Sequence, residues 1–326
     1  MSPDLAQLAD MAQAAVLDGG KRLRPTFAYW GWRTAQPDGA DGETELIRAA
    51  ASLELLQACA LVHDDLMDGS DTRRGRPAAH IRFATEHRAA GWPGPSDSFG
   101  AAGAILLGDL LLSWAAEMFS TPIAALPADR AAHAEHQFDL MRTEVVAGQF
   151  LDVLAQTRGR FDPDEALQVI RYKTSKYTIV RPLLLGSAAA GASAAVEKEL
   201  SGYGHALGEA FQLRDDLLGV YGDPSETGKP AGDDLREGKR TLLVALAMAQ
   251  AGDAQRQIIQ SGVGNPALTE ADVDQLRDLL LSAADAVERR IAARAAEAVG
   301  CLSDSIAPAA RTALVELADA AAHRSF

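Results

Sequence analysis

Residues 53–68, LELLQACALVHDDLMD, join an apolar run to three aspartates. Asp64 and Asp68 stand four residues apart, so both project from one face of a helix, with Asp65 about 100° round. The stretch therefore predicts a long apolar helix that ends in an acidic cluster.

The rest of the chain favours the same kind of element. Alanine and leucine dominate, aromatic residues make up 6%, and the alternation typical of strands is missing almost everywhere. Glycine and proline punctuation predicts about ten helices, with flexible loops over residues 71–97 and 222–238. Leu276, Leu280 and Val287 recur at helical spacing near the end. Since no repeat or linker interrupts the chain, we expect an all-α fold with residues 1–326 as a single domain.

The overall charge excludes several classes of partner. The 326 residues carry a net charge of −14, which disfavours nucleic acid and anionic membrane surfaces. Asp4 and Asp10 stand where a signal peptide would need basic residues. The longest uncharged run, residues 182–196, is shorter than the roughly 20 residues of a spanning helix. We therefore expect a cytoplasmic protein without a membrane span, and its two cysteines fit a reducing compartment.

The first aspartate cluster has two interpretations. A solvated acidic helix end is one, and a Mg²⁺ site is the other, because Mg²⁺ takes carboxylate oxygens and keeps sites for water and phosphate. Arg73 and Arg74 follow closely, and adjacent arginines supply bidentate forks for phosphate oxygens. The pair favours a phosphate ligand.

A second cluster, residues 212–219 (QLRDDLLG), repeats the arrangement on another apolar helix. Asp215 and Asp216 are again followed by a loop with lysines, Lys229 and Lys239, but Gly219 stands where a further carboxylate would fit the pattern. Two aspartate-ended helices that face each other across a bundle would make a metal-bridged diphosphate cage.

Two basic segments lack aspartates. Residues 19–25, GGKRLRP, place Lys21 and Arg24 in a glycine-rich turn, and residues 172–177, YKTSKY, contain Lys173 and Thr174. A solvated turn explains the glycines and the proline of the first segment but not its dense charge, which could hold a second phosphate group. In the second segment, lysines on an amphipathic helix are as good an explanation as a functional role.

Together and in this order, these segments resemble the trans-isoprenyl diphosphate synthases, the polyprenyl synthetase family. The resemblance runs from Gly19 to about Arg240. It implies a helical bundle around a deep central cavity, a homodimer, and head-to-tail condensation of isopentenyl diphosphate with dimethylallyl, geranyl or farnesyl diphosphate. It also implies Mg²⁺ as cofactor, three ions per site with diphosphate bound, with Mn²⁺ as the alternative.

The resemblance also implies a role for each matching residue. Lys21, Arg24, Gln57 and Arg74 would bind isopentenyl diphosphate, and Asp64, Asp65, Asp68, Asp215 and Asp216 would bind metal. Arg73, Lys173, Thr174, Gln212, Lys229 and Lys239 would bind the allylic diphosphate. The residues expected to act in catalysis are Asp64, Asp65, Asp68, Arg73, Lys173, Asp215 and Lys229. The released diphosphate would take the final proton.

Product length should depend on what blocks the cavity near the first cluster. Relatives that stop early have a bulky aromatic about one turn before the first aspartate, whereas this chain has Cys59 and Ala60. A turn is about 5.4 Å long, which admits roughly one more isoprene unit before Leu56, or Trp114 with Met118, forms the floor. We expect geranylgeranyl diphosphate, ahead of farnesyl diphosphate or a longer product.

Two alternatives remain open at this point. A class I terpene cyclase would explain the spacing of Asp109, Ser113 and Glu117, although a cyclase has no use for Lys21 and Arg24. An inactive regulatory subunit of a heteromeric synthase would explain a degraded second motif.

Overall fold

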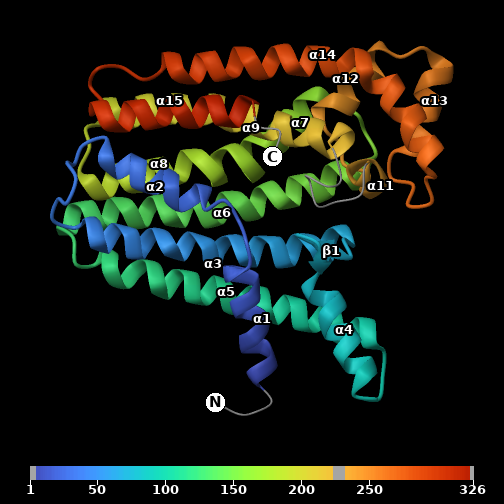
Figure 1. The fold of residues 1–326 in the computed structure, drawn as a ribbon, viewed down its shortest axis with the longest axis horizontal. Coiled ribbons are helices and arrows are strands. Elements are labelled where there is room, and N and C mark those ends of the chain that lie inside the picture. Colours follow the sequence, from blue (N-terminus) through green and yellow to red (C-terminus); the bar gives the residue numbers. More distant parts are fainter. Residues whose placement is uncertain (1–4, 223–231, 324–326) are drawn as a thin grey trace. The chain divides into compact units, whose positions relative to one another are not determined.

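The computed structural model describes residues 5–222 and 232–323, and most of this part is helical (Figure 1). The strands within it are β1 (Thr72–Arg73) and β2 (Arg76–Pro77), each two residues long, which form one antiparallel hairpin. The all-α prediction is confirmed.

The chain divides into two compact units. Unit 1 consists of Met1–Thr26 and Asp41–Ala128, and unit 2 of Phe27–Ala40 and Asp129–Phe326. Helix α2 (Leu23–Arg33) begins in unit 1 and ends in unit 2. The organisation as one domain stays a prediction.

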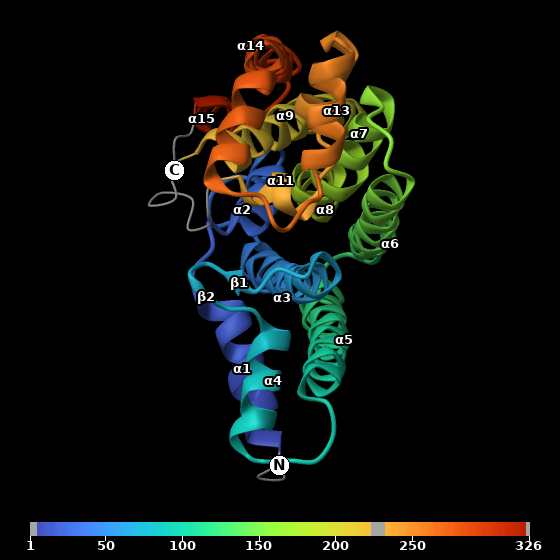
Figure 2. The same cartoon turned by 90° about the vertical axis from the view of Figure 1, so that its right-hand side faces the viewer.

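Unit 1 is built on two long helices, α3 (Glu43–Asp68) and α5 (Ser96–Ile123), which pack along each other (Figure 1). Figure 2 shows the structure turned by 90°, with α3 seen nearly along its axis. Helix α1 (Ala6–Leu17) contacts both, and α4 (Ala79–Ala89) packs on α5. Gly69 ends α3 in the left-handed conformation, with φ of 68°.

The prediction of a flexible loop over residues 71–97 was wrong, because this segment contains the hairpin and α4. The α4 sequence, AHIRFATEHRA, holds good helix formers and buries Phe83 and Ala84 against the unit. Glycine and proline occur on either side of this helix rather than within it.

Unit 2 contains the remaining helices. They are α6 (Ala128–Arg158), α7 (Pro163–Val169), η2 (Ile170–Val180), α8 (Arg181–Ala190), α9 (Ala194–Tyr221), α11 (Asp233–Glu237), α12 (Leu242–Gln250), α13 (Asp253–Gly262), α14 (Glu270–Gly300) and α15 (Pro308–His323). Helix α9 packs against η2, α8, α14 and α15. Leu276, Leu280 and Val287 of α14 are buried, as their spacing predicted. Short helices such as α7, α11 and α13 raise the number above the expected ten.

Two helices, α3 and α5, have the length and composition of a membrane span, although the longest uncharged run in the sequence is shorter than one. The expectation of no span counted only uninterrupted uncharged runs, whereas a span tolerates an occasional charge. In α3, 50% of the apolar window is buried within the structure, and in α5 33%. Length and composition alone are weak support for a span, because the core helix of a soluble protein has the same properties.

Candidate active site

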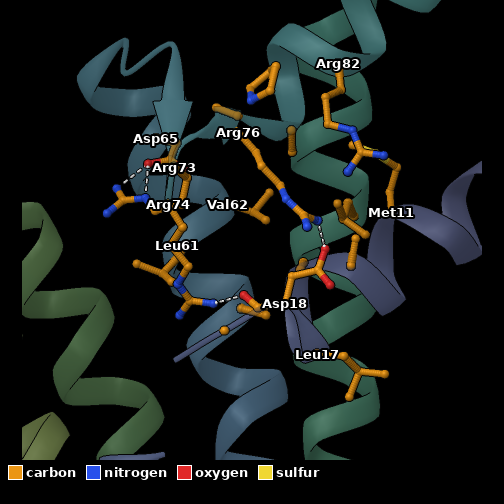
Figure 3. Close-up of a pocket in the computed structure, with 18 residues that line it drawn as sticks. Met11, Leu17, Asp18, Leu61, Val62, Asp65, Arg73, Arg74, Arg76 and Arg82 are labelled. Atoms are coloured by element: carbon orange, nitrogen blue, oxygen red, sulfur yellow. Dashed lines mark hydrogen bonds and ion pairs between the residues drawn. The ribbon is translucent and has the colours of Figure 1, made fainter. Parts of the chain in front are cut away.

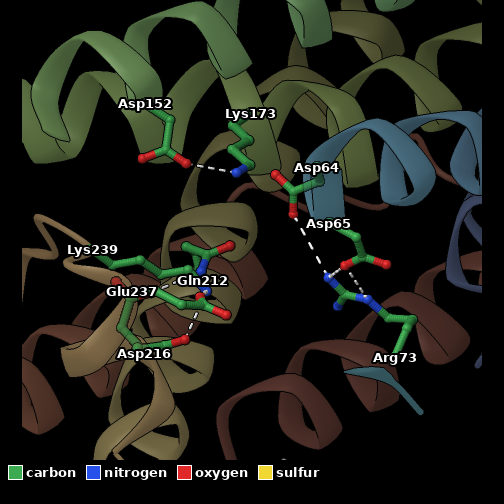
Figure 4. A network of polar contacts seen from close by, with 10 residues as sticks. Asp64, Asp65, Arg73, Asp152, Lys173, Gln212, Asp216, Glu237 and Lys239 are labelled. Carbon is green, nitrogen blue, oxygen red and sulfur yellow. Dashed lines mark hydrogen bonds and ion pairs between the residues drawn. The ribbon is translucent and has the colours of Figure 1, made fainter. Parts of the chain in front are cut away.

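The first aspartate cluster occupies the last turn of α3 in unit 1. The Asp65 side chain is 4% exposed, and that of Asp64 is 19% exposed. Arg73 of β1 donates from Nε to Asp65 Oδ1 at 2.8 Å, and its Nη2 lies 3.9 Å from Asp64 Oδ2 (Figure 4). Arg73 therefore places a guanidinium beside two carboxylates, and its role toward the allylic diphosphate stays a prediction.

The hairpin explains how Arg73 and Arg74 take up different positions. Arg74 and Gly75 form its two-residue turn with φ of 53° and 70°, the left-handed backbone that a tight hairpin turn requires. A non-glycine residue costs energy there, and such strain is found where function fixes a side chain. Arg74 Nη1 donates to the Asp18 carbonyl oxygen at 2.6 Å. This contact brings Arg74 to the turn that precedes Lys21.

The other residues expected to bind isopentenyl diphosphate also lie in unit 1. Lys21 is exposed, Arg24 and Gln57 are half-buried, and Gln57 Oε1 has no hydrogen-bond partner in the described part of the chain. The convergence of all four residues on one diphosphate stays a prediction. Arg22, the remaining cation of that turn, pairs with Glu54 and thereby ties the turn to α3.

The positions expected to control chain length differ in their environments. Cys59 is buried in an apolar cluster with Leu107 and Leu111 of α5, and burial, aided by the charge of Asp109, raises the pKa of its thiol to about 11. Leu56 is also buried, and Ala60 is half-buried. Trp114 is 37% exposed on α5. Their roles in product length stay predictions.

In unit 2, three of the expected residues form a continuous chain of hydrogen bonds. Thr174 Oγ1 donates to Gln212 Oε1 at 2.5 Å. Gln212 Nε2 donates in turn to Asp216 Oδ1 at 2.8 Å (Figure 4). Thr174 belongs to η2, whereas Gln212 and Asp216 lie one turn apart on α9. The structure thus joins the YKTSKY segment to the second aspartate motif, far apart in sequence.

Lys173 has an acidic partner that the sequence interpretation missed. Its Nζ lies 2.6 Å from Asp152 Oδ2 of α6, and both side chains are largely buried (Figure 4). Gly148 allows this approach, because a Cβ there would lie 2.4 Å from the backbone nitrogen of Lys173. Lys173 lies in a π-helical segment, a rare geometry that is often found at functional sites.

Asp216 is a buried carboxylate close to two others, Asp215 and Asp234. Burial raises its pKa to about 8, and the charges of Asp234 and Asp215 add to the shift, against the hydrogen bond from Gln212 and the charge of Lys239. A divalent cation would relieve this repulsion, and carboxylate oxygens are the ligands that Mg²⁺ prefers. The donor set therefore fits magnesium, although within residues 5–222 and 232–323 no three acidic, histidine or cysteine side chains form a ready-made metal cluster.

Asp234 fills the space beside Gly219, the position where the second motif departs from the expected pattern. A Cβ added at Gly219 would lie 1.9 Å from Asp234 Oδ2. The other oxygen of Asp234 pairs with Lys239 Nζ at 2.7 Å, and Glu237 Oε2 lies 3.0 Å from the same nitrogen. Burial by itself would lower the pKa of Lys239, but these two carboxylates raise that pKa well above its usual value.

The structure thus adds acidic partners to the basic residues named from sequence. Asp152, Asp234 and Glu237 were missed, and for the last two a signal existed, since the run DDLREGK places them within five residues of Lys239. Lys229 lies outside the described residues. Asp109 and Ser113, suggestive of a cyclase, lie on α5, where the Asp109 side chain is 65% exposed and 4.0 Å from His63.

Residues 5–280 match the family model described as Polyprenyl synthetase, and the chain belongs to this family. It is an enzyme of the trans-prenyl diphosphate synthase class, as the resemblance predicted, and the family depends on magnesium.

Individual relatives agree with this assignment. The structure of geranylgeranyl pyrophosphate synthase from Corynebacterium glutamicum, complexed with isoprenyl diphosphate and magnesium, is 40% identical with a TM-score of 0.92, covering 98% of this chain and 91% of that one. Geranylfarnesyl diphosphate synthase of Aeropyrum pernix is 33% identical, covering 86% of this chain and 81% of the relative. Geranylgeranyl diphosphate synthase of Saccharolobus solfataricus is also 33% identical, covering 80% of this chain and 73% of the relative.

Proposed function

We propose that this enzyme condenses isopentenyl diphosphate with an allylic diphosphate and releases geranylgeranyl diphosphate. One observation carries the proposal: buried Asp216 lies beside Asp215 and Asp234, hydrogen-bonded through Gln212 to Thr174. Such a site suits a metal-bound diphosphate. Two of the relatives described above are named for the geranylgeranyl product, and one makes the next longer chain.

Magnesium would be held by the two aspartate clusters, with three ions per active site. Its ligands would be Asp64, Asp65 and Asp68 on α3, and Asp215 and Asp216 on α9. When bound, the metal neutralises the diphosphate and stabilises the negative charge that develops as the allylic C–O bond breaks.

The basic side chains would receive the leaving diphosphate. Arg73 pairs with Asp65, Lys173 with Asp152, and Lys239 with Asp234 and Glu237, so each cation is already fixed in place before substrate arrives. Charges that are fixed beforehand cost no reorganisation when the transition state forms. The planar Arg73 fork can hold two phosphate oxygens at once, whereas each lysine acts as a point charge. We assign Lys229 to the same diphosphate.

Isopentenyl diphosphate would bind at the glycine-rich turn of unit 1. Lys21, Arg24 and Arg74 supply positive charge, and the side-chain amide of the half-buried Gln57 can donate from Nε2 to a phosphate oxygen. The double bond of this substrate then attacks the allylic cation. Leu56 and Ala60 would provide the apolar wall that keeps water from the cation and admits a long product.

We also propose that the enzyme is a cytoplasmic homodimer. Helix α5 of unit 1 exposes four large apolar side chains, Ile105, Leu106, Trp114 and Met118, and exposed apolar area of this kind is typical of interaction surfaces. Covering it with a second copy would remove its apolar area from water. Analytical ultracentrifugation of Leu106→Glu should then show dissociation toward monomer.

Product analysis tests the proposed activity. The enzyme would be incubated with Mg²⁺, isopentenyl diphosphate and each allylic diphosphate in turn, and the products separated by chromatography. Elongated diphosphates support the synthase, cyclic hydrocarbons from a single substrate would indicate a cyclase, and no turnover would indicate a regulatory subunit.

Matched variants distinguish the metal site from the exposed acidic surface. Asp64→Asn removes a proposed ligand and should lower kcat by about 10²- to 10⁴-fold, the effect of losing several kcal/mol of charge stabilisation. Asp109→Asn, on the exposed face of α5, should leave kcat within about twofold. Equal losses in both variants would remove the support for the metal assignment.

A further inference from the structure

Unit 1 contains a cavity with a volume of about 450 Å³ (Figure 3). It lies between α1, α3, the hairpin and the first turn of α4. Cavities of 300–1,000 Å³ are the usual size of small-molecule sites. Asp65, Arg73 and Arg74 line part of it, whereas Lys21, Arg24 and Gln57 do not.

One arginine in its wall has no function in the proposed reaction. Arg82 of α4 is half-buried and lines the cavity (Figure 3). Within residues 5–222 and 232–323, its guanidinium takes part in no hydrogen bond or ion pair. By contrast Arg88, on the same helix, contacts Ser96 and Asp97. A half-buried charge without a counter-charge is costly, and an anionic ligand would remove that cost.

The cavity wall as a whole carries an excess of positive charge. Arg76 also lines it and pairs with Asp18, whose side chain is 42% exposed. Arg74 donates to the carbonyl oxygen of the same residue, and the Asp18 carboxylate pairs with Arg76. Burial lowers the pKa of Arg74, and repulsion from Arg22 and Arg73 adds to the shift. In a chain with net charge −14, this is a local concentration of cations.

Apolar side chains make up much of the remaining lining of the cavity. Met11 and Ala14 of α1, Leu61 and Val62 of α3, and Leu107 of α5 contribute to its wall. Met11, Val62 and Leu107 belong to the buried cluster of unit 1. A simple phosphate would leave this wall in water, whereas a hydrocarbon chain would gain about 25 cal/mol for each Å² that it covers.

We propose that this cavity binds an amphiphile with a phosphate or diphosphate head group, its head on Arg82 and Arg76 and its hydrocarbon chain along the wall of α1 and α3. Neither Arg82 nor Arg76 belongs to the proposed catalytic machinery, although Asp65, Arg73 and Arg74 of that machinery line another part of the same cavity. Two sources share this chemistry, the prenyl diphosphates of the family's own reaction and lysophospholipids of the membrane.

Isothermal titration with dodecyl phosphate, in the absence of Mg²⁺ and substrates, tests the proposal without turnover. Arg82→Gln should weaken binding about 10- to 100-fold, the usual effect of losing a charge-assisted hydrogen bond. Arg88→Gln, the matched control on the same helix, should bind like the wild type. Ala14→Trp should fill the space along the apolar wall and so weaken dodecyl phosphate binding, while Arg82 stays in place.

Several outcomes decide the matter. Equal binding of dodecyltrimethylammonium, which has the same chain and a cationic head, would overturn the proposal, as would unchanged affinity in both Arg82→Gln and Ala14→Trp. Displacement of the probe by geranylgeranyl diphosphate would identify a prenyl diphosphate as the ligand, and displacement by lysophosphatidic acid would identify a lipid. If neither displaces it, the proposal fails. Synthase activity can be present or absent in any of these cases, so the two proposals fail independently.

Discussion

Replacing Gly219 by alanine should displace Asp234 and so disturb Lys239. The added Cβ would lie 1.9 Å from Asp234 Oδ2, and an ordinary contact needs at least 3.4 Å, so the carboxylate must retreat by about 1.5 Å. Its bond to Lys239 Nζ, now 2.7 Å, would exceed the length of a charge-assisted hydrogen bond. The substitution therefore acts on a proposed diphosphate ligand without touching it.

Two opposing effects determine the size of the change. Loss of a hydrogen bond between charged groups costs about 1.5–3 kcal/mol, whereas alanine gains about 1 kcal/mol over glycine inside a helix such as α9. Glu237 still holds Lys239 at 3.0 Å. We expect a net loss of about 0.5–2 kcal/mol in the free energy of unfolding, and a loss of about 10-fold in kcat/KM for the allylic diphosphate.

Urea denaturation and steady-state kinetics measure both quantities. Gly300→Ala is a matched control, because Gly300 lies at the end of α14 and a Cβ there would meet nothing within 4 Å. Asp234→Ala serves as the second mutation of a double-mutant cycle. Once the Asp234 carboxylate is absent, Gly219→Ala should have no further effect on kcat/KM, because contacting residues are energetically coupled.

The reasoning would be refuted by either of two results. Wild-type kinetics for Gly219→Ala would mean that Asp234 does not occupy the space beside Gly219. An equal loss in the wild-type and Asp234→Ala backgrounds would mean that Gly219 acts by another route.

Three further predictions concern the core and the product. Glu144→Gln removes the carboxylate shared by the largely buried Lys176 and Arg181, at 2.5 and 2.6 Å, and should lower the urea-measured free energy of unfolding by about 3–5 kcal/mol. Burial would raise the pKa of Glu144, but the hydrogen bonds from both cations lower it below 4.5. The stabilising effect of the Glu144 carboxylate is therefore full above pH 4.5 and should vanish as the pH falls through the lowered pKa. A difference in unfolding free energy between the wild type and Glu144→Gln that does not change with pH would contradict this. With a thiol pKa near 11, Cys59 is about 10⁻³ thiolate at pH 8, so Ellman's reagent should modify the native Cys301→Ser variant very slowly, and rapid modification would refute its burial. Ala60→Phe should shorten the product, seen by chromatography as farnesyl diphosphate, and an unchanged product would remove this position from length control.

Much of the fold and part of the site followed from local sequence. Helical spacing is a local property, so the long helix ending at Asp68 and the buried face of α14 could be predicted. The Arg73 and Arg74 pair predicts a phosphate site, which stays a prediction, and the structure shows Arg73 bound to Asp65. The hairpin was missed because strands of two residues are too short to show alternation.

The remaining site residues depend on contacts between distant elements. Asp152 carries no local signal, and only the close approach of α6 and η2 at Gly148 brings it to Lys173. The π-helical segment likewise has no sequence pattern of its own. Gly219 looked like a lost ligand, and only the packing of α11 on α9 places the Asp234 carboxylate beside it.

The most direct test of the proposed function is the product formed from farnesyl diphosphate, isopentenyl diphosphate and Mg²⁺. We predict geranylgeranyl diphosphate as the main product, identified by mass spectrometry after chromatography, with turnover abolished by a chelator. Absence of any elongated diphosphate with dimethylallyl, geranyl and farnesyl diphosphate alike would contradict the account.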